Sequence, residues 1–174
     1  RSGEPVVKEY QDEYFSRQAL ILDSFARPEQ EPELECAVSL AASLVEPLQG
    51  GDTLLDLVFV AGQVHGFTAG RGLHTSDALL EVLACMESEP SDGFQSLADA
   101  VIGRSAQISA ALCVLLAWDP PRQALVAALR ARAIPTRVLI VGGPAHPDPG
   151  PLADRPADLI RVDPEDPRSA LARL

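Results

Sequence analysis

Two uninterrupted apolar runs in the chain are each followed by an aspartate. The first run leads to Asp23, and the longer second run begins at Ala110 and leads to Asp119. Segments that are apolar on both alternating faces are typical of central strands in a parallel sheet covered by helices on both sides. Ligands of such sheets bind beyond the carboxyl ends of the strands. We therefore expect a candidate site that contains Asp23 and Asp119.

Strand and helix patterns alternate along most of the chain. Short apolar runs between turn residues predict strands, and apolar positions with a period of 3.6 residues predict helices. We expect strands near 6–10, 18–23, 54–61, 63–68, 110–119 and 135–141, and helices near 34–48, 76–86, 94–101 and 120–132. This alternation predicts an α/β domain with a doubly wound, mostly parallel sheet and helices on both faces.

The C-terminal segment 143–174 differs in composition from the rest. Seven prolines lie in it, at positions 144, 147, 149, 151, 156, 164 and 167. This density excludes a long helix or a central strand, but it leaves room for an edge strand at 159–162 and a final helical turn at 169–174. We expect a domain at 1–142 followed by a proline-rich C-terminal extension.

Charge and cysteine content narrow the classes of partner and compartment. Acidic residues outnumber basic ones by 25 to 14, giving a formal net charge of -11. Such a field repels phosphate backbones, so we expect no nucleic-acid partner. Cys36, Cys85 and Cys113 have no metal-ligand spacing, and we interpret them as three buried thiols in a reducing compartment. The chain opens at Arg1 rather than at a methionine, as a fragment would.

The order of elements, with an early strand ending in Asp23 and a later one ending in Asp119, resembles the von Willebrand factor A fold. Three segments are similar to the bacterial family of unknown function numbered fifty-eight: VKEYQDE at 7–13, ECAVSLAASL at 35–44, and GRGL at 70–73 ahead of ALL at 78–80. The resemblance covers roughly Val6 to Val141. It implies a membrane-anchored parent protein, a location at the cytoplasmic face, and a MoxR-type AAA+ ATPase as partner or operon neighbour.

Metal-binding members of the fold carry Asp-x-Ser-x-Ser at the first strand end, a later threonine, and an aspartate after the fourth buried strand. Oxygen ligands of this kind suit Mg²⁺. Asp23 and Asp119 match the two aspartates, and Thr75 is near the threonine position. Phe25 and Arg27 occupy the two serine positions, where one offers no oxygen and the other brings a positive charge. We therefore expect that the metal site is lost, with no cofactor.

Each candidate residue also has a structural interpretation. Asp119 precedes two prolines, as an N-cap aspartate would, and Asp23 could bond to its own loop instead of to a ligand. Arg27 could pair with either acid in place of the lost metal. Trp118 could be an exposed anchor for a partner, or it could pack under a loop.

Three functional hypotheses follow from these residues. The first is a non-enzymatic protein-interaction domain, and the second keeps a metal-dependent ligand site made of Asp23, Ser24, Thr75 and Asp119. The third, a metal-dependent phosphohydrolase, lacks a second acid at position 25, and Lys8 is the only lysine in the chain. No dinucleotide loop, P-loop or nucleophile elbow is present. We favour the interaction domain, with a partner-binding or vestigial site formed by Asp23, Ser24, Arg27, Thr75, Trp118 and Asp119.

Overall fold

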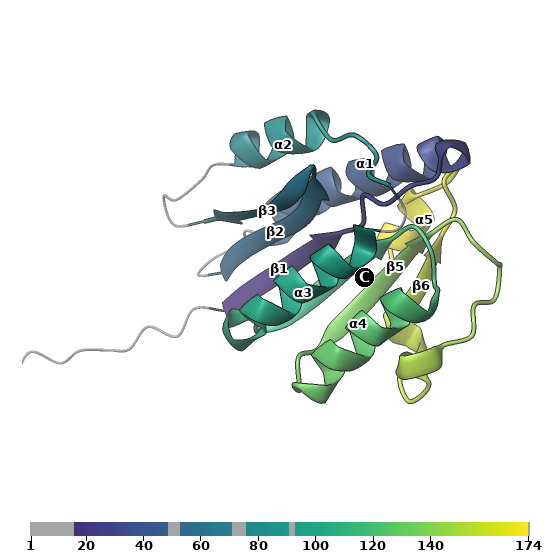
Figure 1. Ribbon diagram of the computed structural model, residues 1–174. Coiled ribbons are helices and arrows are strands. Elements are labelled where there is room, and N and C mark those ends of the chain that lie inside the picture. Colours follow the sequence, from purple (N-terminus) through teal and green to yellow (C-terminus); the bar gives the residue numbers. More distant parts are fainter. Residues whose placement is uncertain (1–15, 49–52, 71–75, 91–92, 174) are drawn as a thin grey trace, which may run out of the picture.

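Among the residues that the structure describes, six strands form one sheet in the order β3-β2-β1-β4-β5-β6 (Figure 1). The computed structural model describes residues 16–48, 53–70, 76–90 and 93–173. Neighbouring strands pair in parallel, except that β2 and β3 form an antiparallel hairpin. The strands are β1 (Ser16–Leu22), β2 (Thr53–Ala61), β3 (Gln63–Ala69), β4 (Ala110–Leu115), β5 (Thr136–Val141) and β6 (Leu159–Val162).

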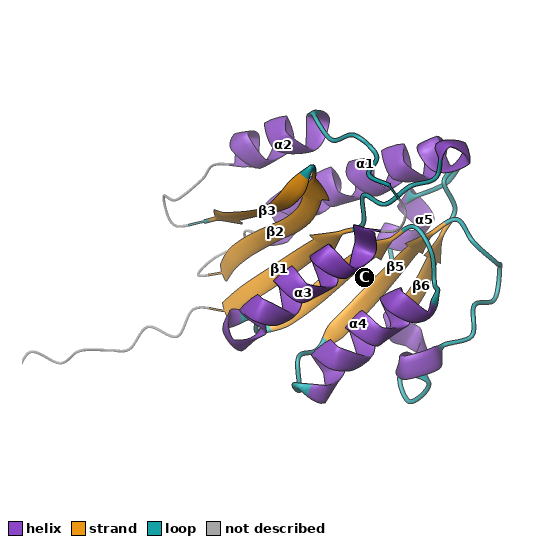
Figure 2. Cartoon of the chain, in the orientation of Figure 1, coloured by secondary structure: helices purple, strands orange, loops and turns teal. Residues whose placement is uncertain are grey.

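Helices cover both faces of the sheet (Figure 2). The helices are α1 (Glu31–Leu48), α2 (Ser76–Ala84), α3 (Phe94–Arg104), α4 (Pro120–Ala131) and α5 (Arg168–Leu171). One apolar cluster lies between the sheet and α1, α2 and α5, and a second lies between the sheet and α3 and α4. The predicted doubly wound α/β fold is therefore confirmed.

The alternation of side chains along β1 explains why this strand is apolar throughout. Leu20 and Leu22 belong to the cluster under α1, whereas Ala19 and Ile21 belong to the cluster under α3 and α4. Successive side chains of a strand point to opposite faces, so a strand with helices on both faces has no solvent-facing position. The pattern that predicted a central strand thus reflects burial on two sides.

The connections of the sheet diverge between β1 and β4. From β1 the chain crosses through α1 to β2 on one side, whereas β4 lies on the other side of β1, with Leu22 in register with Val114. Such a switch point leaves a crevice beyond the carboxyl ends of the two strands. Asp23 follows β1 directly, and Asp119 follows β4 after a short loop. The two aspartates are therefore at the same edge of the sheet, as predicted.

Several element boundaries differ from the prediction, and several agree with it. The antiparallel hairpin and the edge strand at 159–162 are confirmed. The prediction that a strand continues to Asp119 is wrong, because β4 ends at Leu115 and the backbone N–H of Leu116 donates to the Asp23 carboxylate. The strand expected at 6–10 lies outside the described residues. Within the described part of the chain, every helix is too short or too polar to span a bilayer.

The expectation of three buried thiols is wrong for Cys85. Cys36 and Cys113 are buried, but Cys85 is exposed. The buried residues of α2 are Leu79 and Leu83. Cys85 follows Leu83 by two positions, which is more than half a helical turn, so it lies away from the packed side.

Candidate functional site

Asp23 is completely buried at the end of β1. Its backbone N–H donates to the carbonyl of Val114 across the strand ends at 2.9 Å. One carboxylate oxygen accepts from the Phe25 backbone N–H at 3.1 Å. The other accepts from the Leu116 backbone N–H at 3.0 Å and from Nε of Arg122 at 2.6 Å. Donors from three separate segments therefore satisfy this buried carboxylate.

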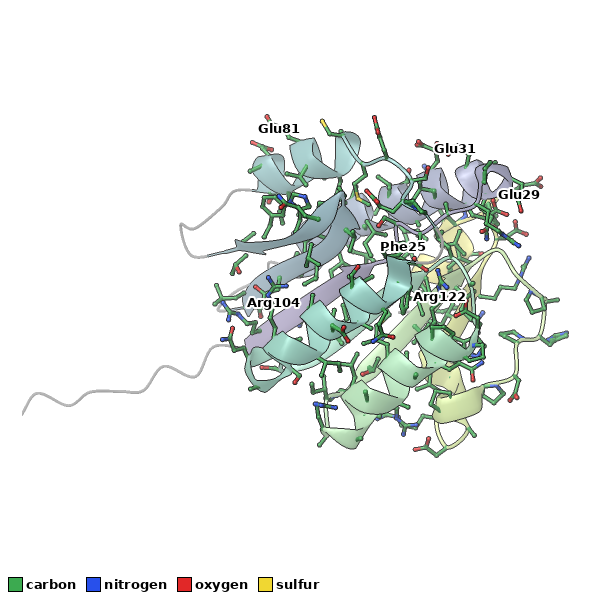
Figure 3. All side chains as sticks on the ribbon, in the orientation of Figure 1. Phe25, Glu29, Glu31, Glu81, Arg104 and Arg122 are labelled. Carbon is green, nitrogen blue, oxygen red and sulfur yellow. The ribbon has the colours of Figure 1, made fainter. Side chains whose placement is uncertain are left out.

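Arg122 is the cation of the site, and its side chain is only 6% exposed. Besides the bond from Nε to Asp23, its Nη1 donates to the Asp119 carboxylate at 2.7 Å. Its Nη2 lies 3.5 Å from the carbonyl oxygen of Phe25, and the guanidinium carbon lies 4.5 Å from the ring centroid of Phe94. Figure 3 shows Arg122 and Phe25 near each other at this end of the sheet. The guanidinium thus links two carboxylates and lies on an aromatic ring.

Opposing effects act on the ionisation of Arg122. Burial by itself would lower the pKa, but the negative charges and hydrogen bonds of Asp23 and Asp119 outweigh burial and raise the pKa above its ordinary value. The two ion pairs differ in strength, because the Asp23 side chain is fully buried and that of Asp119 is 40% exposed. Solvent screens the second pair more than the first. The Arg122–Asp23 pair is therefore the stronger of the two ion pairs.

Asp119 also caps α4. Its backbone is extended, and its carboxylate accepts from the backbone N–H of Arg122 at 3.2 Å. Pro120 occupies the first helical position, where no N–H donor is needed. The N-cap interpretation of Asp119 is confirmed, and the same residue also pairs with the guanidinium three positions later.

Two aromatic rings form the wall of the site. Phe25 is 3% exposed, and its ring meets that of Phe94 edge to face with centroids 6.0 Å apart. Gly93 lies directly beside Phe25, since an added Cβ would come within 2.6 Å of the ring. The start of α3 therefore depends on a glycine to approach this close. Position 25 is a metal-ligand position in the resembled fold. Here it is occupied by the buried ring of Phe25, which offers no oxygen ligand.

Ser24 is buried, and its hydroxyl donates to the carbonyl of Val60 at 2.7 Å. Its own carbonyl accepts from the backbone N–H groups of Ala26 and Glu89, at 3.0 and 2.8 Å. These bonds hold the ends of β1 and β2 and the segment after α2 together. Ser24 thus has a structural role in this arrangement.

Arg27 does not join the site. It is exposed, and its Nε lies 3.3 Å from Glu29 and 3.1 Å from the side-chain oxygen of Gln30. The hypothesis that Arg27 pairs with Asp23 or Asp119 is therefore wrong. Arg27 lies at the start of a short 3₁₀ turn, Pro28–Gln30, where its side chain turns toward its own neighbours.

Trp118 packs under the C-terminal segment. Its ring contacts the cluster under α3 and α4, and its indole N–H donates to the carbonyl of Asp148 at 2.6 Å. The interpretation of packing under a loop is therefore confirmed. Thr75, the remaining candidate, lies outside the described residues.

The donor set does not fit a divalent cation. The Asp23 oxygens already accept three hydrogen bonds, and a guanidinium lies between Asp23 and Asp119. Among the residues that the structure describes, no three His, Cys, Asp or Glu side chains gather as metal ligands would. An ion between the two aspartates would have to displace Arg122 and leave its positive charge buried and unpaired. The chemistry available here is charge neutralisation within the chain.

Arg122 was absent from the sequence prediction, although a signal for it exists. It precedes Leu125 by three positions and Val126 by four, so it lies on the apolar stripe of α4. An arginine on a buried stripe needs an acid nearby. Two aspartates at neighbouring strand ends could have supplied the expected partners.

Comparison with known proteins finds no matching family model and no matching curated protein. Among solved structures, proximal thread matrix protein 1 from the mussel byssus superposes with a TM-score of 0.57, at 12% identity over 85% of this chain and 43% of its own. The same protein with a zinc-occupied MIDAS motif gives 0.58, at 10% identity over 86% and 44%. The fold is von Willebrand factor A-like.

The von Willebrand factor A-like chain spans less than half the length of the mussel protein. An aerotolerance-related membrane protein from Bacteroides fragilis, carrying multiple mutations to serine, matches at 13% identity over 91% of this chain and all of its own, with a TM-score of 0.49. At 12% and 10% identity, the two mussel structures share with this chain the fold alone. The chemistry of the present site therefore rests on its own residues.

Proposed function

We propose that this chain is a non-enzymatic protein-interaction domain whose strand-end face binds a partner without a metal ion. The observation that supports the proposal is the buried guanidinium of Arg122, which pairs with Asp23 and Asp119 at 2.6 and 2.7 Å. A site closed in this way offers no open coordination position for a ligand carboxylate. Recognition then depends on the outer surface of the face.

The exposed groups around this face suggest the charge of the partner. Glu29 and Glu31 are exposed at the amino end of α1, and Figure 3 shows them projecting away from the sheet. The whole chain has a formal net charge of -11. Complementary charge steers association and sets the register of an interface. A partner with a basic surface fits this face best.

The resemblance to the bacterial family numbered fifty-eight supplies a specific candidate. Its members are typically encoded beside MoxR-type AAA+ ATPases. We propose such an ATPase as the partner, with a membrane-anchored parent protein that places this domain at the cytoplasmic face. Calorimetric titration of the cognate ATPase against this chain and against the full-length protein is the direct test.

The titration should show binding that persists in EDTA and weakens as salt rises. The comparison with EDTA is made without nucleotide, because nucleotide binding by the ATPase itself needs a divalent ion. Glu29→Lys with Glu31→Lys should weaken binding. Glu81→Lys should not, since Figure 3 shows Glu81 on α2, away from the other two. The proposal would be refuted if neither this chain nor the full-length protein bound the ATPase at any salt concentration. Binding that EDTA abolishes would refute it as well.

A further inference from the structure

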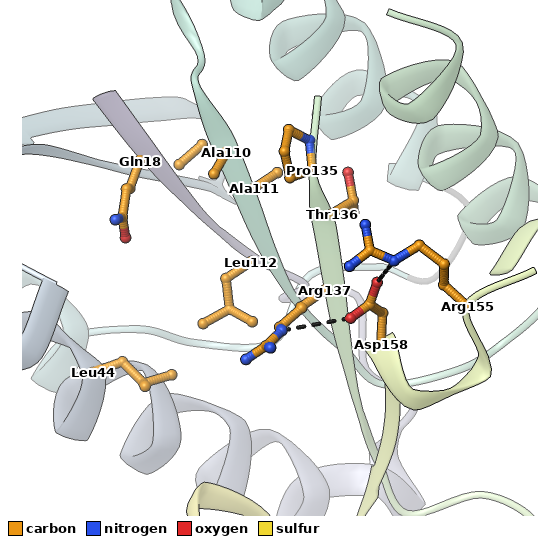
Figure 4. Close-up of a pocket in the computed structure, with 11 residues that line it drawn as sticks. Gln18, Leu44, Ala110, Ala111, Leu112, Pro135, Thr136, Arg137, Arg155 and Asp158 are labelled. Carbon is orange, nitrogen blue, oxygen red and sulfur yellow. Dashed lines mark ion pairs between the residues drawn. The ribbon is translucent and has the colours of Figure 1, made fainter. Parts of the chain in front are cut away.

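A cavity of about 360 Å³ opens at the end of the sheet opposite to Asp23. Residues near the starts of three neighbouring strands line it, including Gln18 of β1, Ala110 of β4 and Thr136 of β5. Leu44 of α1 lies across from them (Figure 4). Volumes of roughly 300–1,000 Å³ are usual for small-molecule sites. The cavity is therefore large enough to hold a small organic ligand.

Most of the lining is apolar. Leu44 and Leu112 lie on one side, and Ala110, Ala111 and Pro135 extend the carbon surface along the strand starts (Figure 4). Side chains of this size and kind favour an aliphatic chain, whose burial is worth about 0.8 kcal/mol for each methylene group. The apolar part of the lining would contact the hydrocarbon part of a ligand.

Charged groups gather at one side of the cavity. The Asp158 carboxylate lies 3.6 Å from Nε of Arg137 and 2.9 Å from Nε of Arg155. Figure 4 shows the carboxylate between the two guanidinium groups. The Asp158 side chain is 11% exposed, whereas those of Arg137 and Arg155 are 48% and 62% exposed. The lining thus carries two cations and one anion, although the chain as a whole is strongly acidic.

We propose that this cavity binds an aliphatic monocarboxylate. The hydrocarbon chain lies against Leu44 and Leu112, and the carboxylate lies beside Arg155 at the mouth. A single negative charge suits a lining whose charged side chains are two arginines and one aspartate. A phosphate group would carry more negative charge close to the Asp158 carboxylate, which opposes it. The cavity is separate from the strand-end face, so the proposal does not depend on the partner proposed above.

Decanoate is the probe, titrated below its micellar concentration and followed by amide chemical shifts. We expect one saturable site, with the largest shifts at Leu44, Ala111 and Leu112. Ala110→Leu fills the cavity with apolar volume at a half-buried position and should abolish binding. Arg155→Gln should weaken decanoate binding by up to about fivefold, the upper end of the range for an exposed ion pair. Arg132→Gln, at the exposed C-cap of α4 and outside the cavity, is the matched control and should leave binding unchanged.

Decanol tests the charge requirement with the same hydrocarbon chain. It should bind more weakly than decanoate, and Arg155→Gln should leave its affinity unchanged. The proposal fails if decanoate shows no saturable site, if Ala110→Leu binds it as the parent chain does, or if Arg155→Gln leaves its affinity intact. Equal affinity for decanol and decanoate would equally overturn it, because the ligand class would then not be a carboxylate.

Discussion

At the scale of single residues, Asp23 shows how a completely buried charge is maintained. Desolvating a lone carboxylate is costly, and the cost is offset only by close charge pairing and full hydrogen bonding. Asp23 has both, from Arg122 and from two backbone N–H groups. Loss of the arginine would leave the same carboxylate buried without its counter-charge.

Replacing Arg122 with methionine keeps the approximate volume and removes the charge. We expect a loss of about 3–5 kcal/mol in the free energy of unfolding, the usual cost of breaking a buried pair by removing one partner. Urea denaturation measures it. Arg132→Met, at the exposed C-cap of the same helix, is the control and should stay within about 0.5 kcal/mol. Equal effects of the two substitutions would refute the role of Arg122.

A double variant separates the ion pair from simple packing. Asp23→Asn removes the charge at the other end of the pair and keeps one acceptor oxygen, which can serve the backbone N–H of Phe25 or that of Leu116 but not both. Combined with Arg122→Met, it should be clearly more stable than the sum of the single changes predicts, because no unpaired charge remains. Additive effects would indicate that the two residues do not interact.

The thiols give a further residue-scale prediction. Burial raises the pKa of Cys113 to about 12, and burial, with the nearby carboxylates of Asp163 and Glu33, also raises that of Cys36. A raised thiol pKa removes the reactive thiolate at pH 8. We expect an aromatic disulfide reagent to modify exposed Cys85 rapidly, with Cys36 and Cys113 reacting only after unfolding. Cys85→Ser should abolish the rapid phase, and rapid labelling of Cys113 would contradict the structure.

At the scale of elements, the contact between α3 and the loop after β1 depends on Gly93. An added Cβ would meet the ring of Phe25, which is itself held by Phe94. Gly93→Ala should therefore destabilise the chain by about 1–3 kcal/mol in thermal or urea unfolding, as overpacking of a core does. Gly93→Ser introduces a good N-cap residue, but it also adds the same Cβ. We therefore expect it to destabilise the chain as well.

Gly103, in the same helix, is the matched control for Gly93. Nothing lies within 4 Å of a Cβ added there. Gly103→Ala should stabilise the chain by up to about 1 kcal/mol, because alanine has the higher helix propensity. Stabilisation by both alanine substitutions would show that Phe25 does not restrict this position.

Local features of the elements could be predicted from the sequence, whereas features that depend on distant residues could not. The N-cap role of Asp119 rests on its own helix, and burial on two faces can be read directly from the apolar run of β1. The end of β4 could not be predicted in this way. An apolar run indicates burial, but it does not indicate which acceptor each backbone N–H bonds to. Arg122 was missed because its fully buried partner, Asp23, is 99 positions away, although its partly exposed partner, Asp119, is only three positions away.

At the scale of the whole molecule, cation independence is the property to measure. Magnesium or manganese at millimolar concentration should leave the melting temperature unchanged, since specific binding to the native state would raise it by mass action. A saturable rise would contradict this prediction if Asp119→Asn removed it. That substitution keeps a good N-cap at a partly exposed position, so the fold should remain for the comparison.

The pairing of Arg122 with the strand-end aspartates also fixes the stoichiometry of the site. A metal ion is a separate component, so its occupancy follows the concentration of free cation and can be removed by a chelator. Arg122 is synthesised with the chain, so every folded copy carries one counter-charge. The counter-charge of the two aspartates is then set at translation and not by the concentration of free divalent cation. Regulation of the binding proposed for this face would then come from the partner or from other parts of the protein, without a dissociable metal ion.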